Sequence, residues 1–214
     1  MRSKIPEVIL GFQSLMMQIV FSEKKLDVRG PAIFLDRDGV INCRRPGDYV
    51  LNWSQFLFVS GIQAALKQLS ALHLPMIVIS NQAAVGKGLL NPLALEEITA
   101  QMQQTLLADG VSLAAVFYCT HRADENCDCR KPRPAMLLGA ANKFNIDLSR
   151  SIFIGDSASD IEAGLAAGCK PVLFGSTHFE SSGNSLPVNG IPVARTAEEL
   201  FPISVKCLKD CGVS

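Results

Sequence analysis

From Pro31 onward the chain alternates short apolar runs with longer segments of helical periodicity, and this alternation constrains the fold more than any other feature. Such runs are typical of strands buried on both faces of a parallel sheet, and the longer segments are typical of crossover helices. We predict strands at residues 32–35, 76–79, 115–118, 151–154 and 171–174. We predict helices at residues 61–72, 92–108, 134–144 and 158–167, and a last helix that begins near Thr196, whose hydroxyl can cap it. The predicted fold is a Rossmann-like α/β domain with helices on both faces of a parallel sheet.

The length and composition favour one domain with a short N-terminal extension. A chain of 214 residues that is 48% hydrophobic can bury one sizeable core, which we place in residues 31–214. Residues 1–30 are a separate extension, in which the apolar run 8–21 predicts an extra helix. We do not interpret this run as a signal peptide, because Pro6 and Glu7 interrupt the basic region and no small-residue cleavage site follows.

The charge balance argues against two classes of partner. Twenty basic and twenty acidic residues cancel, so no global field draws the protein to nucleic acid or to an anionic membrane. No stretch reaches the roughly 18 consecutive apolar residues that would predict a membrane span. We therefore expect neither nucleic-acid binding nor stable membrane insertion.

Three of the seven cysteines lie close together beside a histidine. Cys119, His121, Cys127 and Cys129 supply three sulfurs and one imidazole, which is a complete tetrahedral set for Zn²⁺. Four protein ligands leave no open position, so we predict a structural zinc that holds a loop and positions the residues after it. Free thiols and a zinc cluster are typical of a reducing compartment, and we expect a cytoplasmic protein.

Polar residues follow the predicted strands at the points where the strands end. Asp36 and Asp38 follow the first strand, and Asp156 follows the fourth. Ligands of open parallel sheets bind at the carboxyl ends of the strands, so these carboxylates should converge. Oxygen ligands of this kind suit Mg²⁺. Alternatively, Asp38 with Gly39 forms an ordinary turn.

Two further segments carry candidate phosphate ligands. Ser80, Asn81 and Gln82 follow the second strand and offer hydroxyl and amide donors, although an ordinary strand-to-helix loop would look the same. Arg130 and Lys131 follow the cysteine cluster, where the alternative is solvated surface charge. The prolines at 132 and 134 stiffen the backbone there and favour a fixed geometry.

Four motifs in this order resemble the haloacid dehalogenase superfamily. They are FLDRDGVIN at 34–42, ISNQ at 79–82, CRKPRP at 129–134 and FIGDSASD at 153–160. The cysteine–histidine cluster and YVLNWSQFLFVSG at 49–61 most resemble the D-glycero-D-manno-heptose-1,7-bisphosphate 7-phosphatase group, which lacks a large cap domain. The short loop between His121 and Cys127 is more similar to the sibling histidinol phosphatases.

The resemblance implies a role for each candidate residue. Asp36 would attack phosphorus to form an aspartyl-phosphate, and Asp38 would protonate the leaving oxygen and then activate water. Ser80 and Lys131 would hold the phosphoryl oxygens, with Asn81, Gln82 and Arg130 contacting the substrate. Mg²⁺ would bind Asp36, the backbone carbonyl of Asp38 and Asp156, with Asp160 outside its ligand shell.

These roles predict a magnesium-dependent phosphatase. The substrate implied is a phosphorylated sugar, D-glycero-D-manno-heptose 1,7-bisphosphate, which would lose its 7-phosphate. Histidinol phosphate is the alternative substrate. We expect the protein to be a monomer. A nonenzymatic binding module should have lost Asp36 or Lys131, and both are present. A nucleic-acid 3′-phosphatase should show a basic strip or stacking aromatics. A dehalogenase would have no use for the acid at Asp38, because a halide leaves without a proton.

Overall fold

The computed structural model describes residues 8–9, 16–20, 28–45, 47–175 and 190–213, which form one eight-stranded sheet in the order β1-β2-β5-β4-β3-β6-β7-β8. The six strands from β5 to β8 are parallel, whereas β2 runs antiparallel to β5 and β1 antiparallel to β2. The strands are β1 (Val8–Ile9), β2 (Met16–Val20), β3 (Ile33–Leu35), β4 (Met76–Asn81), β5 (Leu113–Cys119), β6 (Ile152–Gly155), β7 (Lys170–Phe174) and β8 (Val193–Ala194).

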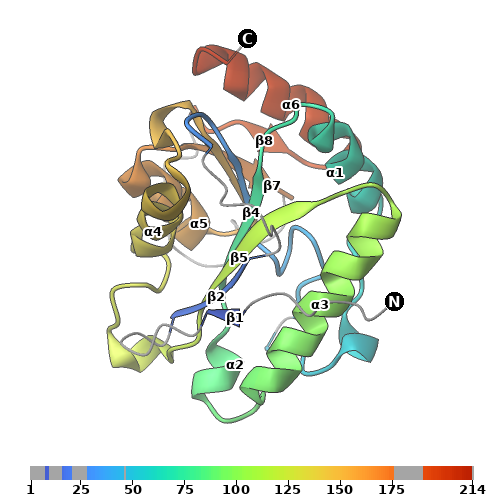
Figure 1. The fold of residues 1–214 in the computed structure, drawn as a ribbon, viewed down its shortest axis with the longest axis vertical. Helices are drawn as coiled ribbons and strands as arrows, with labels where there is room; N and C mark the ends of the chain where they lie inside the picture. Colours follow the sequence, from blue (N-terminus) through green and yellow to red (C-terminus); the bar gives the residue numbers. More distant parts are fainter. Residues whose placement is uncertain (1–7, 10–15, 21–27, 46, 176–189, 214) are drawn as a thin grey trace.

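Helices cover both faces of the sheet, as predicted (Figure 1). The α-helices are α1 (Ile62–Ser70), α2 (Ala83–Gly86), α3 (Pro92–Ala108), α4 (Ala135–Phe144), α5 (Ala158–Ala167) and α6 (Ala197–Asp210). Short 3₁₀ helices lie at η1 (Trp53–Gln55), η2 (Ala123–Glu125) and η3 (Leu148–Arg150).

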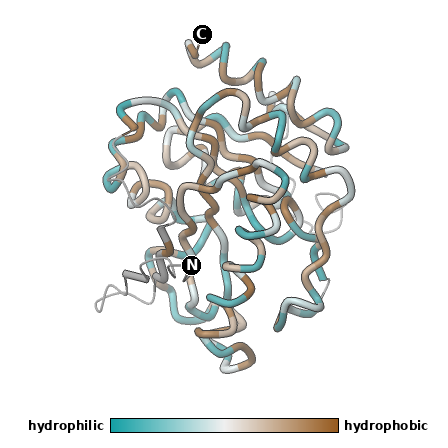
Figure 2. The backbone as a smooth tube through the Cα atoms, turned by 45° about the vertical axis from the view of Figure 1, so that its right-hand side comes forward, coloured by the Kyte–Doolittle hydropathy of each residue, from teal (hydrophilic) through white to brown (hydrophobic). Residues whose placement is uncertain are grey.

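The strands divide their side chains between two hydrophobic cores. In β3, Ile33 and Leu35 pack with helices α1, α3 and α6, whereas Phe34 between them packs with α4 and α5 on the other face. This division follows from the two-residue period of a strand. The hydropathy colouring in Figure 2 shows α6 alternating hydrophobic and hydrophilic residues, as expected for a helix with one face on a core.

Local sequence signals explain where the helices begin. The side chain of Asn91 accepts a hydrogen bond from the backbone of Leu93, and Pro92 occupies the first position of α3. At α5, Ser157 and Asp160 form a reciprocal capping box. Thr196 does precede α6, but its hydroxyl makes no capping hydrogen bond, so that detail of the prediction is wrong. Instead, the Glu199 carboxylate accepts from the backbone N–H of Arg195.

The prediction of a helix in the N-terminal extension is wrong for the part of it that the structure describes. Residues 8–9 and 16–20 form strands β1 and β2, and β2 pairs with β5 from Met16 opposite Cys119 to Val20 opposite Ala115. Without β2, strand β5 would present unpaired backbone groups at the edge of the sheet. The edge of β5 therefore provides hydrogen-bond partners for residues 16–20 of the apolar run, and the sequence alone does not indicate these partners. The rest of residues 1–27 lies outside the described residues.

The segment between β3 and α1 carries no inserted cap domain in its described residues. It contains η1 and isolated bridges that join Asp38 to Asn42 and Asn42 to Phe58. The predicted loop at 176–192 lies mostly outside the described residues, and β8, which follows it, was not predicted. No helix in the described part of the chain is long and apolar enough to cross a membrane.

Candidate active site

Three buried carboxylates meet at the carboxyl ends of the central strands. Asp36 follows β3, Asp156 follows β6, and Asp160 lies in the first turn of α5; an oxygen from each lies within 4.8 Å of the others. Octahedral Mg²⁺ with ligands at 2.0–2.1 Å holds its oxygens at most ~4.2 Å apart, so a small inward movement of these side chains would let the group hold such an ion. Asp156 Oδ2 is buried and has no hydrogen-bond partner, which leaves it available to a cation.

Two glycines make room for this cluster. A Cβ atom added to Gly39 would lie 1.8 Å from Asp156 Oδ2, and Gly39 has φ +99°, a value that disfavours other residues. A Cβ atom added to Gly155 would lie 2.2 Å from Asp160 Cβ. Gly39 therefore allows the loop after β3 to lie against Asp156, and Gly155 allows the end of β6 to lie against Asp160.

Lys131 is the buried counter-charge of the cluster. Its ammonium lies 2.8 Å from Asp36 Oδ1 and 2.6 Å from Asp160 Oδ1, and it donates to the carbonyl of Ile79 at 2.9 Å. The ammonium thus makes two ion pairs with the carboxylates and one hydrogen bond with the backbone. Although burial opposes its charge, the two carboxylates raise the pKa of Lys131, so it stays protonated.

The carboxylates nevertheless carry an excess of negative charge. Burial, only partly offset by Lys131 and augmented by Asp160, raises the pKa of Asp36 to about 6. Burial and the charge of Asp36 raise the pKa of Asp156 to about 8. Arg44, which donates to Asp156 Oδ1 at 3.0 Å, partly offsets this effect. Raised pKa values in Asp36 and Asp156 are expected where a cation normally shares a site with crowded carboxyl groups.

Asp38 lies apart from the other carboxylates, in a cage of donors. Arg37 Nη2 contacts both of its oxygens, at 3.0 and 2.9 Å, Asn42 donates to Oδ1 at 2.9 Å, and Gln82 donates to Oδ2 at 2.7 Å. Burial alone would raise the pKa of Asp38, but Arg37, Asn42 and Gln82 together lower it below its usual range. Its side chain is thus separate from the metal-like cluster, which has Asp160 as its third carboxylate.

The predicted phosphate ligands at the end of β4 are already engaged with protein groups. Ser80 is 1% exposed, and its hydroxyl accepts from Gln82 Nε2 at 3.1 Å. Asn81 exchanges two hydrogen bonds with the backbone of Lys131, donating to its carbonyl at 3.2 Å and accepting from its N–H at 3.1 Å. The amide of Asn81 therefore fixes the position of Lys131.

Several residues at the site were given no role from the sequence. Arg37 and Asn42 hold Asp38, and Arg44 reaches Asp156 across 112 positions. A cavity of about 510 Å³ opens beside Asp156. It is lined by Gly39, Cys43, Arg44, Val59, Ser60, Asp156, Phe174, Gly175, Arg195, Thr196, Ala197 and Glu198. The predicted substrate ligand Arg130 is partly buried, and its Nη1 atom has no hydrogen-bond partner.

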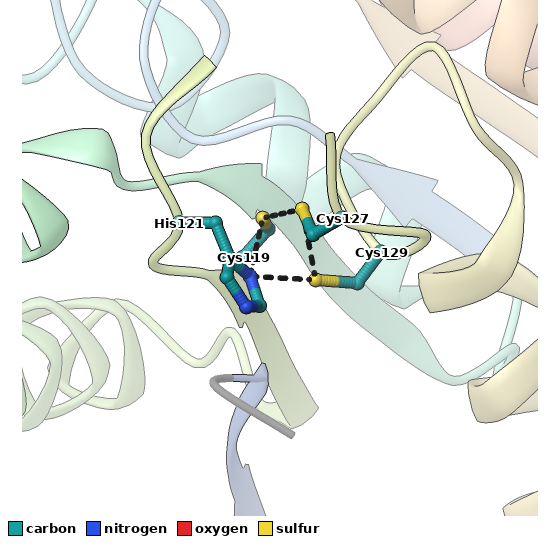
Figure 3. A group of neighbouring side chains, drawn as sticks. All are labelled: Cys119, His121, Cys127 and Cys129. Atoms are coloured by element: carbon teal, nitrogen blue, oxygen red, sulfur yellow. Dashed lines mark hydrogen bonds between the residues drawn. The ribbon is translucent and has the colours of Figure 1, made fainter. Parts of the chain in front are cut away.

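The four predicted zinc ligands converge in one group (Figure 3). Cys119 Sγ lies 3.6 Å from both His121 Nδ1 and Cys127 Sγ, and Cys129 Sγ lies 3.2 Å from His121 Nδ1 and 3.7 Å from Cys127 Sγ. Tetrahedral Zn²⁺ with its usual bond lengths would place two sulfurs about 3.8 Å apart and a sulfur and a nitrogen about 3.6 Å apart. The observed spacings fit this ion closely. A hydrogen bond from Cys129 lowers the pKa of Cys119 to about 5, which favours the thiolate.

Backbone contacts join this thiol–imidazole cluster to the edge of the sheet that carries the buried carboxylates. Cys119 ends β5, and its carbonyl accepts from the backbone N–H of Gln82 at 2.7 Å. Lys131 follows two residues after Cys129. A cation bound by the cluster would therefore hold the segment that delivers Arg130 and Lys131.

Fold and site together define a hydrolase of the haloacid dehalogenase type. A model of HAD-hydrolase-like proteins matches residues 128–190. A Helicobacter pylori (strain J99) protein named D-glycero-beta-D-manno-heptose-1,7-bisphosphate 7-phosphatase is 41% identical over 140 residues, which cover 65% of this chain and 79% of the relative. A Mycobacterium tuberculosis protein named as the alpha-anomer enzyme is 40% identical over 149 residues, which cover 67% and 78%.

A solved structure supports the same assignment. The D,D-heptose 1,7-bisphosphate phosphatase of B. bronchiseptica, complexed with magnesium and phosphate, superposes with a TM-score of 0.74. It is 29% identical, and the match covers 84% of this chain and 99% of that one. The chain therefore belongs to the heptose-bisphosphate phosphatase family of the haloacid dehalogenase superfamily.

Proposed function

We propose that the protein removes the 7-phosphate of D-glycero-D-manno-heptose 1,7-bisphosphate through an aspartyl-phosphate on Asp36. The observation that carries this proposal is the pairing of Asp36 with Lys131 at 2.8 Å inside a group of three buried carboxylates, next to the separately held Asp38. Named relatives in the same family supply the substrate.

The geometry supports the proposed division of labour. With a pKa of about 6, Asp36 is mostly ionised at neutral pH and can attack phosphorus, which splits the hydrolysis into two easier steps. Asp38, whose donors lower its pKa, would bind a proton when the negatively charged phosphate enters the site, give that proton to the leaving oxygen and then take one from the attacking water. Ser80 and Lys131 would hold the phosphoryl oxygens, and Arg130, with a free guanidinium nitrogen, would contact the rest of the substrate.

Both metal sites form part of the proposal. Asp36, Asp156 and the backbone carbonyl of Asp38 would hold Mg²⁺, which when bound supplies positive charge against the negative charge of the transition state. Asp160, bonded to Lys131 and to Ser157, would orient the site from outside the metal shell. Cys119, His121, Cys127 and Cys129 would hold a structural Zn²⁺, because their spacing suits a closed tetrahedral site.

The cellular setting follows from the same chemistry. All seven cysteines are free, and the thiol cluster needs reduced sulfur to bind a metal. We therefore propose a cytoplasmic enzyme. We also propose that it is a monomer, with residues 1–30 as an extension of the catalytic domain 31–214. Gel filtration with light scattering of the full chain tests the oligomeric state.

The decisive experiment is phosphate release with Mg²⁺ against a matched panel. The panel holds both anomers of the heptose bisphosphate, histidinol phosphate, glucose 6-phosphate and a 3′-phosphorylated oligonucleotide. We expect kcat/KM for one heptose anomer to exceed that for every other substrate by at least ~10-fold, because a site built for its polar groups rejects analogues that leave them unpaired. Preference for histidinol phosphate would overturn the substrate assignment. Absence of phosphate release from every substrate of the panel would overturn the proposed phosphatase activity.

A further inference from the structure

Gln82 is buried between the two halves of the proposed catalytic machinery. It lies directly after β4, is 3% exposed, and its side-chain Nε2 donates to Asp38 Oδ2 at 2.7 Å and to Ser80 Oγ at 3.1 Å. An ionised carboxylate only accepts hydrogen bonds, so the atom that faces Asp38 must be the nitrogen. Both amide protons are then used inside the protein, and neither is left for a substrate.

The contact with Asp38 constrains an otherwise soft torsion. Rotation of a carboxylate about its last bond is broad and roughly two-fold, so neighbouring donors decide its orientation. Arg37 contacts both oxygens and Asn42 contacts only Oδ1. Gln82 supplies the second donor to Oδ2 and thereby fixes which oxygen faces the end of β4.

The contact with Ser80 constrains the direction of a proton. A serine hydroxyl has one proton to donate and two lone pairs to accept with. Because Ser80 Oγ accepts from Gln82, its own proton remains free to point toward a phosphoryl oxygen. Because the Gln82 amide donates to Ser80 Oγ, the Ser80 hydroxyl can act as a donor toward the phosphate.

Gln82 is itself held rigidly. Its backbone N–H donates to the carbonyl of Cys119 at 2.7 Å, and its carbonyl accepts from Val85 N–H at 3.2 Å in the first turn of α2. The side chain therefore has a fixed base on two elements, as a group that orients others needs.

We infer that Gln82 is a positioning residue that couples the acid–base carboxylate Asp38 to the phosphate-binding hydroxyl of Ser80, and that it does not contact the substrate. This inference rests on the proposed phosphatase function. It replaces the sequence-based prediction of Gln82 as a substrate ligand, and it makes one test specific: loss of Gln82 should matter most when the leaving group needs a proton.

The test compares two substrates of different leaving group. A sugar phosphate releases an alkoxide that must be protonated, whereas acetyl phosphate releases acetate, which leaves as a stable anion. Gln82→Glu replaces a donor with an acceptor, and Gln82→Leu removes the donor without adding charge. We expect kcat/KM, which reports transfer of the phosphoryl group to Asp36, to fall at least ~30-fold on the sugar phosphate in both variants and less than ~5-fold on acetyl phosphate, because general acid catalysis contributes about 10²–10⁴-fold and only the sugar leaving group needs it.

A second buried glutamine provides the matched control. Gln103 is 6% exposed and bonds both backbone groups of Leu113, away from the carboxylates. Gln103→Glu should lower the unfolding temperature without changing the ratio of the two activities.

Equal losses on both substrates in the Gln82 variants would overturn the inference in favour of a structural role, and a raised KM with unchanged kcat would overturn it in favour of substrate contact. If the wild type releases phosphate from neither substrate, the proposed function itself fails, which is a separate result. Should Gln82→Glu not fold, Gln82→Leu alone decides the question.

Discussion

The carboxylate cluster and the thiol–imidazole cluster are two candidate metal sites with opposite designs. The first brings together Asp36 and Asp156, with Asp160 beside them, from segments up to 124 positions apart, and it would need water or substrate to complete a coordination shell. The second takes all four ligands from residues 119–129 and is complete without any other group. An open oxygen site can exchange ligands during a reaction, whereas a closed sulfur site can only hold a loop in place.

The electrostatics of the two clusters differ in the same sense. Burial and mutual repulsion raise the pKa values of Asp36 to about 6 and of Asp156 to about 8. Without a cation, the ionised forms of both carboxyl groups are therefore disfavoured. In the sulfur site, contact with Cys129 lowers the pKa of Cys119 to about 5. The comparison suggests that one metal serves the reaction and the other the fold, and each prediction below tests that division.

The largest expected effect is that of Asp36→Asn. The amide is nearly the same size but cannot attack phosphorus, so we expect turnover to fall at least ~10⁴-fold, as when other enzymes lose their nucleophile. The raised pKa means that the ionised carboxylate is disfavoured in the folded state, so the neutral amide should leave the unfolding temperature unchanged or slightly higher. Phosphate release and thermal unfolding measure the two quantities. Activity near that of the wild type would rule out Asp36 as the nucleophile.

Removal of the two metals should give contrasting losses. Transfer of the zinc-loaded protein to magnesium-free buffer should lower turnover ~1,000-fold with little change in unfolding temperature, and added Mg²⁺ should restore the rate within the mixing time. Stripping of zinc should lower the unfolding temperature by about 5 °C or more, and Mg²⁺ should not reverse this change. Elemental analysis of both forms verifies the metal content. If magnesium repairs the zinc-stripped protein, the two sites are not divided as proposed.

Sequence predicted these two clusters for different reasons. The sulfur ligands are close in sequence, so their spacing alone indicated the site. The carboxylates could be brought together only by placing Asp36 and Asp156 at strand ends and assuming a parallel sheet. Arg44 escaped prediction because nothing local indicates that it reaches Asp156.

The same distinction explains the fold. Helix α3 occupies residues 92–108 as predicted, because Asn91 and Pro92 mark its start in the sequence itself. The N-terminal extension was predicted as a helix, but its described residues are strands. They pair with the edge of β5, which is distant in the sequence, so no local pattern could indicate this partner. Local signals were sufficient where the neighbours were local.

The third prediction concerns Cys127→Ser, which removes one ligand of the sulfur site. We expect bound zinc to fall from about one per chain to near zero. Turnover should fall ~10–100-fold, as when other outer partners of a catalytic site are lost. The loss should be smaller than that of Asp36→Asn, because Lys131 would be displaced but not removed. Cys211→Ser, in a partly exposed thiol at the end of α6, is the control and should change neither zinc content nor rate. Full activity in a zinc-free Cys127→Ser protein would show that the loop does not need the metal.

The smallest expected effect is that of Arg130→Met, which tests whether the zinc-held segment contributes binding as well as position. The methionine keeps much of the aliphatic stem but removes the guanidinium, whose Nη1 atom has no partner in the protein. We expect KM for the heptose bisphosphate to rise about tenfold with kcat within about threefold, because a contact made equally in the ground and transition states changes KM alone. Arg122→Met, on the same loop but paired with Asp124 at the surface, is the matched control and should leave both constants unchanged. A fall in kcat without a change in KM would instead show that Arg130, like Lys131, stabilises the transition state. The sulfur site would then position two residues that act in the reaction itself, a more direct role than its closed geometry suggests.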